Sequence, residues 1–348
     1  MDVRMCVGNL TLTGSCALAF VLLSLSSVAY AQQHQRNNQR PPACDPYDKV
    51  PVPVADLPTL KDRQVLASCN SQDLYFGFDH PADPVKARKC AYIERETGKG
   101  VPETVFGAAG LLTMIYANGK GAARNFDLAF KFACEVDGAL AENDYRFKHL
   151  LKLKKEHWSG DNFNLCDDAT SGFMQGFCAG LQEDFDHAER TRKLSAMTVK
   201  WTPAEQTAFR ELQKAASAYF EASSRNEVDL SGTGRAAFEI EAEASLNDDF
   251  VAAVERFEKG QLPKFMPSDF SKSDAELNSI YSKIQADPNN TVGLSTVTPQ
   301  GIQIAECAWL RYREAWVKFG QLKYPSVTPD SWRTLLTQGR IKVLKSLT

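Results

Sequence analysis

The sequence predicts an all-α protein, and three observations predict it. Apolar residues recur at three- and four-residue spacing, the alternation typical of strands is nowhere sustained, and helix-capping residues divide the chain at intervals. With 348 residues, 43% of them hydrophobic and 24% charged, the chain has the composition of a globular protein and not of a disordered or collagen-like one. The net charge of −3 argues against nucleic acid as a partner.

The first 31 residues have the pattern of a secretory signal peptide. An apolar stretch at 17–25 is followed by Ala29, Tyr30 and Ala31, a small-residue cleavage site. The stretch is shorter than the roughly 20 residues that span a bilayer, which favours a cleaved signal over the alternative of an uncleaved anchor. No other segment is long and apolar enough to span. We therefore expect a soluble protein that is periplasmic or secreted.

Seven cysteines remain after cleavage: Cys44, Cys69, Cys90, Cys134, Cys166, Cys178 and Cys307. Export makes disulfide bonds their expected state. No CxxC motif or zinc-finger spacing occurs, so no metal site is predicted. Six cysteines allow fifteen pairings, among which Cys166 with Cys178 is the most local. Cys307 lies in a helical pattern and is expected to be a buried, inert thiol.

Residues 32–60 are expected to form a flexible leader, because Gln, Asn, Arg and Pro predominate there and apolar periodicity is nearly absent. Short helical units occupy 61–160. Two of them share an aromatic residue, a glycine, an Asp or Asn, and an alanine four residues later. The first supplies Tyr75, Gly77, Asp83 and Ala87, and the second Tyr116, Gly119, Asn125 and Ala129. The glycine suits a helix C-cap and the Asp or Asn an N-cap, so each unit predicts a helical hairpin.

The second hairpin resembles the Sel1-like repeat family. Its matching residues are Ile115, Tyr116, Gly119, Gly121, Asn125 and Ala129, whereas the first hairpin matches less well. The resemblance implies an α-solenoid surface that binds other proteins. Two units are fewer than the roughly three that a free-standing solenoid needs, so this region would stack on the helices C-terminal to it. Two ordinary helical hairpins remain the alternative.

From residue 167 onward the predicted helices lengthen. They cover 167–199, 202–225, 235–258, 273–285, 299–319 and 329–347. Thr202, Pro203 and Glu205 supply an N-cap, a first-turn proline and a first-turn acid. Gly260 and Pro263 end the third of these helices.

Charge is distributed unevenly along this part of the chain. Residues 221–258 hold ten acidic and three basic side chains, a balance of −7, whereas 264–348 have a balance of +4. Solvated helix faces that attract one another within the protein explain this pattern most simply. An anionic docking surface is the alternative.

Three motifs succeed one another in the last part of the chain. They are Asp274-Ala-Glu-Leu-Asn278 with Tyr281, Ala308-Trp-Leu-Arg-Tyr-Arg-Glu-Ala315, and Leu336-Thr-x-x-Arg340-x-x-x-Leu344. Their order and spacing resemble the LprI-type lysozyme-inhibitor family. The resemblance covers 263–348, and 161–262 resembles a diverged companion. Many members carry a cysteine soon after the second motif, where this chain has Trp316 and Val317.

The motif residues themselves predict packing. Trp309, Tyr312, Trp316 and Phe319 form one stripe of a helix and are predicted core residues. Similar stripes on the helices before and after it predict a three-helix antiparallel arrangement; their residues are Leu277, Ile280, Tyr281 and Ile284, and Leu335, Leu336, Val343, Leu344 and Leu347. Arg313 and Arg340 are predicted to pair with a carboxylate such as Asp274 or Glu276.

No Gly-x-Ser-x-Gly, Walker or His-Glu-x-x-His motif occurs, so we predict no catalytic, cofactor-binding or metal-binding residue and expect that the protein is not an enzyme. The LprI-type resemblance implies a protein that binds and inhibits lysozyme, a basic enzyme, with 221–258 steering the encounter. The alternative is a periplasmic Sel1-like scaffold or adaptor that docks protein partners without inhibiting lysozyme. A wall-modifying hydrolase is the least favoured hypothesis.

Overall fold

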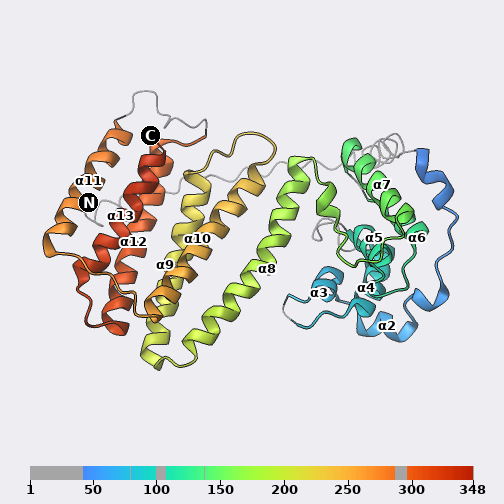
Figure 1. Cartoon of the computed structure of the whole chain (residues 1–348), viewed down its shortest axis with the longest axis horizontal. Coiled ribbons are helices and arrows are strands. Elements are labelled where there is room, and N and C mark those ends of the chain that lie inside the picture. The colour runs from blue at the N-terminus through green and yellow to red at the C-terminus, as the bar shows by residue number, and fades with distance from the viewer. Residues whose placement is uncertain (1–41, 79, 99–106, 137, 287–295, 348) are drawn as a thin grey trace, which may run out of the picture. The chain divides into compact units, whose positions relative to one another are not determined.

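The computed structural model describes residues 42–78, 80–98, 107–136, 138–286 and 296–347. Throughout these ranges the regular elements are helices, without a strand, which confirms the all-α prediction (Figure 1). The predicted signal peptide, the first part of the expected leader and most of the loop after residue 286 lie outside the described residues. None of the described helices combines the length and apolar character needed to cross a membrane.

The described chain forms two compact units, which divide between Asp184 and Phe185. We call them the N-terminal unit and the C-terminal unit. The division falls inside α8 (Gly172–Thr198).

The N-terminal unit is built from short helices. They are η2 (Pro42–Tyr47), η3 (Val54–Asp56), α2 (Leu60–Val65), α3 (Ser71–Phe76), α4 (Pro84–Thr97), α5 (Gly107–Asn118), α6 (Phe126–Ala133), α7 (Leu140–Lys155) and η4 (Leu165–Asp168). The pairs α3–α4 and α5–α6 pack together and are the two predicted hairpins. They fit both a Sel1-like repeat and an ordinary helical hairpin.

The predicted caps of these hairpins are present. Gly77 and Gly119 have φ values of 76° and 64°, in the left-handed region that glycine tolerates. The Asp83 carboxylate accepts a hydrogen bond from the Lys86 amide, 3.0 Å away. Asn125 likewise accepts from the first-turn amides of α6. Each cap satisfies backbone donors that the helix itself leaves free.

The described part of the range expected to be a flexible leader, 42–60, is instead attached to the N-terminal unit. Cys44 forms a disulfide with Cys134. The Tyr47 ring stacks on Phe130 with 4.6 Å between centroids. The Lys131 ammonium donates to the carbonyls of Asp48 and Val50. The sequence pattern missed this because the contacts come from residues more than 80 positions away.

Three disulfides join pairs of described cysteines: Cys44–Cys134, Cys69–Cys90 and Cys166–Cys178. The local pair predicted from the sequence is thus confirmed. Cys307 is also disulfide-bonded and only partly buried, so the prediction of a buried, inert thiol there is wrong. Disulfides of this kind are typical of proteins that fold in an oxidising compartment.

The C-terminal unit consists of the second half of α8 and five further long helices. These are α9 (Pro203–Asn226), α10 (Arg235–Glu258), α11 (Pro267–Gln285), α12 (Pro299–Lys323) and α13 (Pro329–Ser346). Thr202 caps α9 in a reciprocal capping box with Glu205, as predicted. α11 begins six residues earlier than expected, because Pro267 at its first position starts the helix and does not break it.

Helix α12 lies at the centre of this unit. All four residues of the predicted aromatic stripe, including Trp309 and Trp316, are buried, which confirms it. The predicted three-helix arrangement needs correction, since α12 packs chiefly against α9, and α11 against α13. Tyr219 and Phe220 of α9 pack on the Tyr312 ring of α12. One hydrophobic core therefore draws on both 161–262 and 263–348.

Candidate functional site

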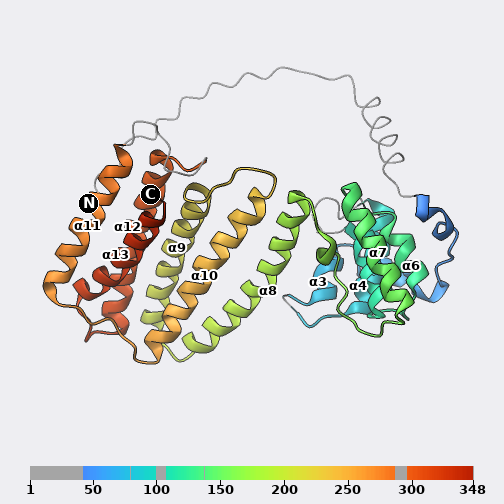
Figure 2. The same cartoon turned by 45° about the horizontal axis from the view of Figure 1, so that its top comes forward.

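A groove of about 610 Å³ lies between α10 and α13 of the C-terminal unit. The two helices run in opposite directions (Figure 2). Phe257 of α10 meets Trp332 of α13 at one end, with 5.0 Å between ring centroids. The floor is aromatic and comes from α9 and α12; it consists of Tyr219, Phe220, Trp309, Tyr312 and Trp316. Pockets of this size and apolar character are typical of ligand- and partner-binding sites.

Each wall of the groove continues the apolar face that its helix turns to the core. α10 supplies Leu246, Phe250, Ala253 and Phe257, of which Phe250 and Phe257 are buried core residues like Val251 and Val254. On α13 the wall is formed by Trp332, Leu335, Leu336, Gly339 and Val343. A Cβ atom added at Gly339 would meet no atom within 4 Å, so the groove is open there.

Exposed charged side chains stand at the rim of the groove. Asp249 and Arg256 project from α10, and Lys342 from α13. None of the three forms an ion pair with another described residue. Their charges are therefore available to a bound molecule.

The acidic stretch 221–258 has two roles in the structure. Glu221 and Glu239 pair with Arg225, and Asp248 pairs with Arg190. Further acids bind buried or half-buried partners elsewhere in the unit. The predicted attraction to the basic residues of 264–348 is seen in two other pairs, Glu227 with Arg340 and Glu258 with Lys323.

Some other acidic residues of α10 are not engaged in ion pairs with described residues. Glu241, Asp249 and Glu255 form no ion pair within the described parts of the chain. Of these three acids, Asp249 lines the groove and the other two do not.

A buried ion cluster lies beneath the groove. The Arg340 guanidinium donates to both carboxylate oxygens of Glu227, at 2.9 and 2.5 Å, and to Glu306 at 2.7 Å. All three side chains are almost fully buried. Burial raises the pKa of Glu306, while the charge of Arg340 opposes that shift. Although its own burial works the other way, the pKa of Arg340 is raised because Tyr219 and the two carboxylates surround it.

This cluster corrects one of the two predicted arginine pairings. Arg313 does pair with Asp274, at 3.6 Å, as predicted. Arg340 pairs with neither Asp274 nor Glu276, and Glu276 binds Lys345 instead. The partners of Arg340 are 113 and 34 residues away in the sequence, so no local pattern could identify them.

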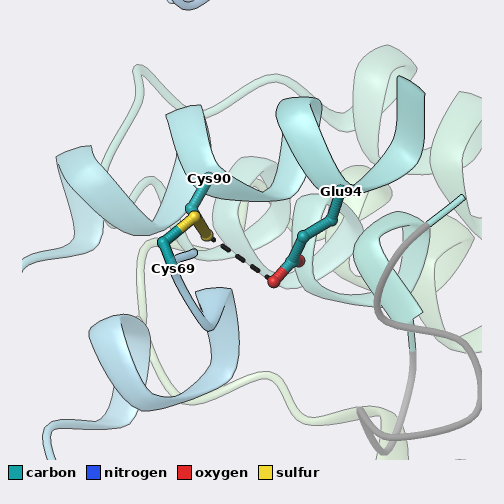
Figure 3. Close-up of side chains that lie close together, drawn as sticks. All are labelled: Cys69, Cys90 and Glu94. Carbon is teal, nitrogen blue, oxygen red and sulfur yellow. Dashed lines mark hydrogen bonds between the residues drawn. A yellow bond between two sulfur atoms is a disulfide. The ribbon is translucent and has the colours of Figure 1, made fainter. Parts of the chain in front are cut away.

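A second cluster, in the N-terminal unit, brings together Cys69, Cys90 and Glu94 (Figure 3). Their ligand-type atoms lie within 4.8 Å of one another. The two sulfur atoms are joined as a disulfide, and the Glu94 carboxylate accepts hydrogen bonds from the Ser71 amide and hydroxyl at the start of α3. Burial raises the pKa of Glu94. In this oxidised form the cluster holds α3 on α4 and offers no free thiolate to a metal.

A His149–Asp168 pair in the N-terminal unit had no signal in the sequence. The His149 Nδ1 atom lies 3.2 Å from each carboxylate oxygen of Asp168. Burial raises the pKa of Asp168. No hydroxyl or thiol of a described residue is hydrogen-bonded to His149, so the pair lacks the nucleophile that a catalytic triad requires.

Comparisons with known proteins found no match to this chain among family models, curated proteins or solved structures. The LprI-type and Sel1-like resemblances therefore stay predictions from their motifs. The geometry by itself identifies the groove between α10 and α13, with its aromatic floor and unpaired rim charges, as the candidate binding site.

Proposed function

We propose that this chain is an exported, disulfide-stabilised protein of the LprI-like type that inhibits lysozyme by binding it, without catalysis. The groove between α10 and α13 is the observation that carries the proposal. It combines an apolar aromatic surface with unpaired charges at the rim, as the central pockets of protein interfaces do.

The location is inferred from two independent features. The first 31 residues have the composition of a signal peptide, and three disulfides join cysteines of the N-terminal unit. Both favour the periplasm or the extracellular space.

Lysozyme as the partner rests on the three LprI-like motifs and on charge. Lysozyme is basic, and Glu241, Asp249 and Glu255 leave α10 acidic. Opposite charges of this kind accelerate association between proteins, and salt screens the effect.

The test is the clearing of a cell-wall suspension by lysozyme, monitored by turbidity, with and without the purified mature chain. We expect inhibition, and an association rate that falls about tenfold between about 0.02 and 0.3 M salt. A variant with Glu241→Gln, Asp249→Asn and Glu255→Gln should associate slowly at both salt concentrations. Full lysozyme activity in the presence of excess wild-type chain would overturn the proposal.

A periplasmic scaffold that docks other proteins is the second candidate. The paired hairpins α3–α4 and α5–α6 favour it, because stacked helical hairpins form extended binding surfaces. Crosslinking in envelope extract separates the two. A scaffold would retain its partners when Gly339→Phe fills the groove of the C-terminal unit, whereas a lysozyme inhibitor that uses the groove would not.

A further inference from the structure

We propose that the groove between α10 and α13 binds an amphipathic α-helix of a partner protein, which places a basic residue beside Asp249 and acidic residues beside Arg256 and Lys342. The inference rests on the proposed function only in that the chain acts by binding a protein. It does not require that the partner be lysozyme.

The dimensions of the groove suit a helix. On α10 the lining positions extend over 246–257 and on α13 over 332–343. At 1.5 Å per residue each wall is about 17 Å long, or three helical turns. Both walls present side chains at intervals of three and four residues. These are the ridges between which a third helix packs.

The walls also leave space for a helix backbone. Ala252 and Ala253 on α10 and Gly339 on α13 are the small residues of the lining. At Gly339 there is open space for at least 4 Å around a built Cβ atom. A partner helix can therefore approach closely here and place its apolar side chains against the partly exposed Leu246, Leu335 and Leu336.

The charges at the rim favour a peptide over a fatty acid or similar anionic amphiphile. Lys342 and Arg256 would suit an anionic headgroup, but Asp249 would repel it. A helix satisfies both signs at once, because it can carry a basic residue at one position and acidic residues at others.

The probe is a fluorescently labelled synthetic peptide of about 18 residues, or five turns. It carries leucines along one helical face, with both lysines and glutamates at the positions beside that face. We expect binding to the mature wild-type chain with a Kd of about 10 μM, measured by anisotropy. A control peptide with serine in place of leucine should bind at least about tenfold more weakly.

The decisive variant is Gly339→Phe, which fills the open part of the groove. Because glycine is a poor helix former and the site is open, this variant should melt at or above the wild-type temperature while its Kd rises at least about tenfold. Ser245→Phe is the matched control, since Ser245 is exposed on α10 outside the lining, and it should bind as the wild type does. Asp249→Lys should weaken binding about fivefold.

Three outcomes would overturn the inference. One is equal peptide affinity in Gly339→Phe and the wild type. Another is no peptide binding together with quenching of tryptophan fluorescence by oleate, which would assign the groove to an amphiphile. The third is that the wild-type chain binds no peptide and is a dimer, and that Gly339→Phe is a monomer. That result would show that a second copy of the chain occupies the groove. Peptide binding without lysozyme inhibition would overturn the lysozyme proposal alone.

Discussion

The two units of this protein hold their helices together in different ways. In the N-terminal unit α2 and α3 have six residues each and the longest helix, α7, has 16. In the C-terminal unit the helices from α9 to α13 have 18 to 25 residues. Three disulfides join residues of the N-terminal unit, whereas the C-terminal unit, in which Cys307 is also disulfide-bonded, is organised around an aromatic core and the Arg340 ion cluster.

The difference shows how helix length decides the means of stabilisation. Helices shorter than about 12 to 15 residues are marginal by themselves, because few hydrogen bonds offset the entropy lost in forming the first turn. The N-terminal unit compensates with capping side chains and covalent links. Longer helices bury a continuous apolar stripe and can also shield a charged group such as Arg340. Substitutions confined to one unit at a time test this contrast.

The largest effect is expected from the disulfide that spans the longest segment. Cys44 and Cys134 are separated by 90 residues. Replacing both with Ala should destabilise the N-terminal unit by roughly 4 to 5 kcal/mol in the chain-entropy model, because the unfolded chain gains freedom. Hydrogen exchange measured by mass spectrometry should show faster exchange in α6 and in η2. Exchange in α12 serves as the internal control and should not change. Unaltered exchange in α6 would mean that packing alone holds this unit.

A slightly smaller effect is expected from Arg340→Leu in the C-terminal unit. The change leaves Glu227 and Glu306 buried without a counter-charge and should reduce the free energy of unfolding by about 3 to 5 kcal/mol. Chemical denaturation monitored by tryptophan fluorescence measures it. Lys345→Leu is the control, because its ion pair with Glu276 is about half exposed and should contribute under about 1 kcal/mol. Similar losses for both variants would contradict a special role for the buried cluster.

The smallest effect concerns the pH dependence of one cap in the N-terminal unit. Hydrogen bonds from the Thr59 side chain and backbone, together with Lys89, lower the pKa of Asp62 to about 2 from 3.8. A lowered pKa means that the native state favours the carboxylate, so this stabilisation is complete above about pH 4 and is lost as the pH falls toward 2. NMR titration of the Asp62 carboxyl carbon measures it.

Two substitutions serve as controls for the Asp62 titration. Thr59→Ala should return the pKa toward its ordinary value, and Asp62→Asn should remove this contribution to acid sensitivity. Titration of Asp62 near 3.8 in the wild-type protein would show that the reciprocal cap with Thr59 does not persist in solution.

Several features were predictable because their causes are local. Gly77, Asp83 and Asn125 act as caps through atoms only a few residues away, so the type and spacing of residues were sufficient. The buried stripe of α12 is a direct result of helical periodicity. The Cys166–Cys178 disulfide, 12 residues apart, is the shortest closure among the cysteines.

The candidate site was much less predictable. The sequence pointed to 221–258 as an acidic surface, and Asp249 does lie at the rim of the groove. Nothing local showed that α13 forms the opposite wall. A broad apolar face such as that of α10 has the same sequence pattern whether all of it is covered or part of it lines a groove.

The sequence by itself therefore determined that the chain is helical, where most helices begin and end, and which stripes are apolar. These properties depend on backbone hydrogen bonds and on side chains within about one or two turns. The tertiary structure alone decided that α12 pairs with α9, that Arg340 meets Glu227, that Cys44 fastens 42–60, and that a groove stays open between α10 and α13. Those choices depend on whether the shapes and charges of two helix surfaces match. The two surfaces are distant in the sequence and meet only when the chain folds.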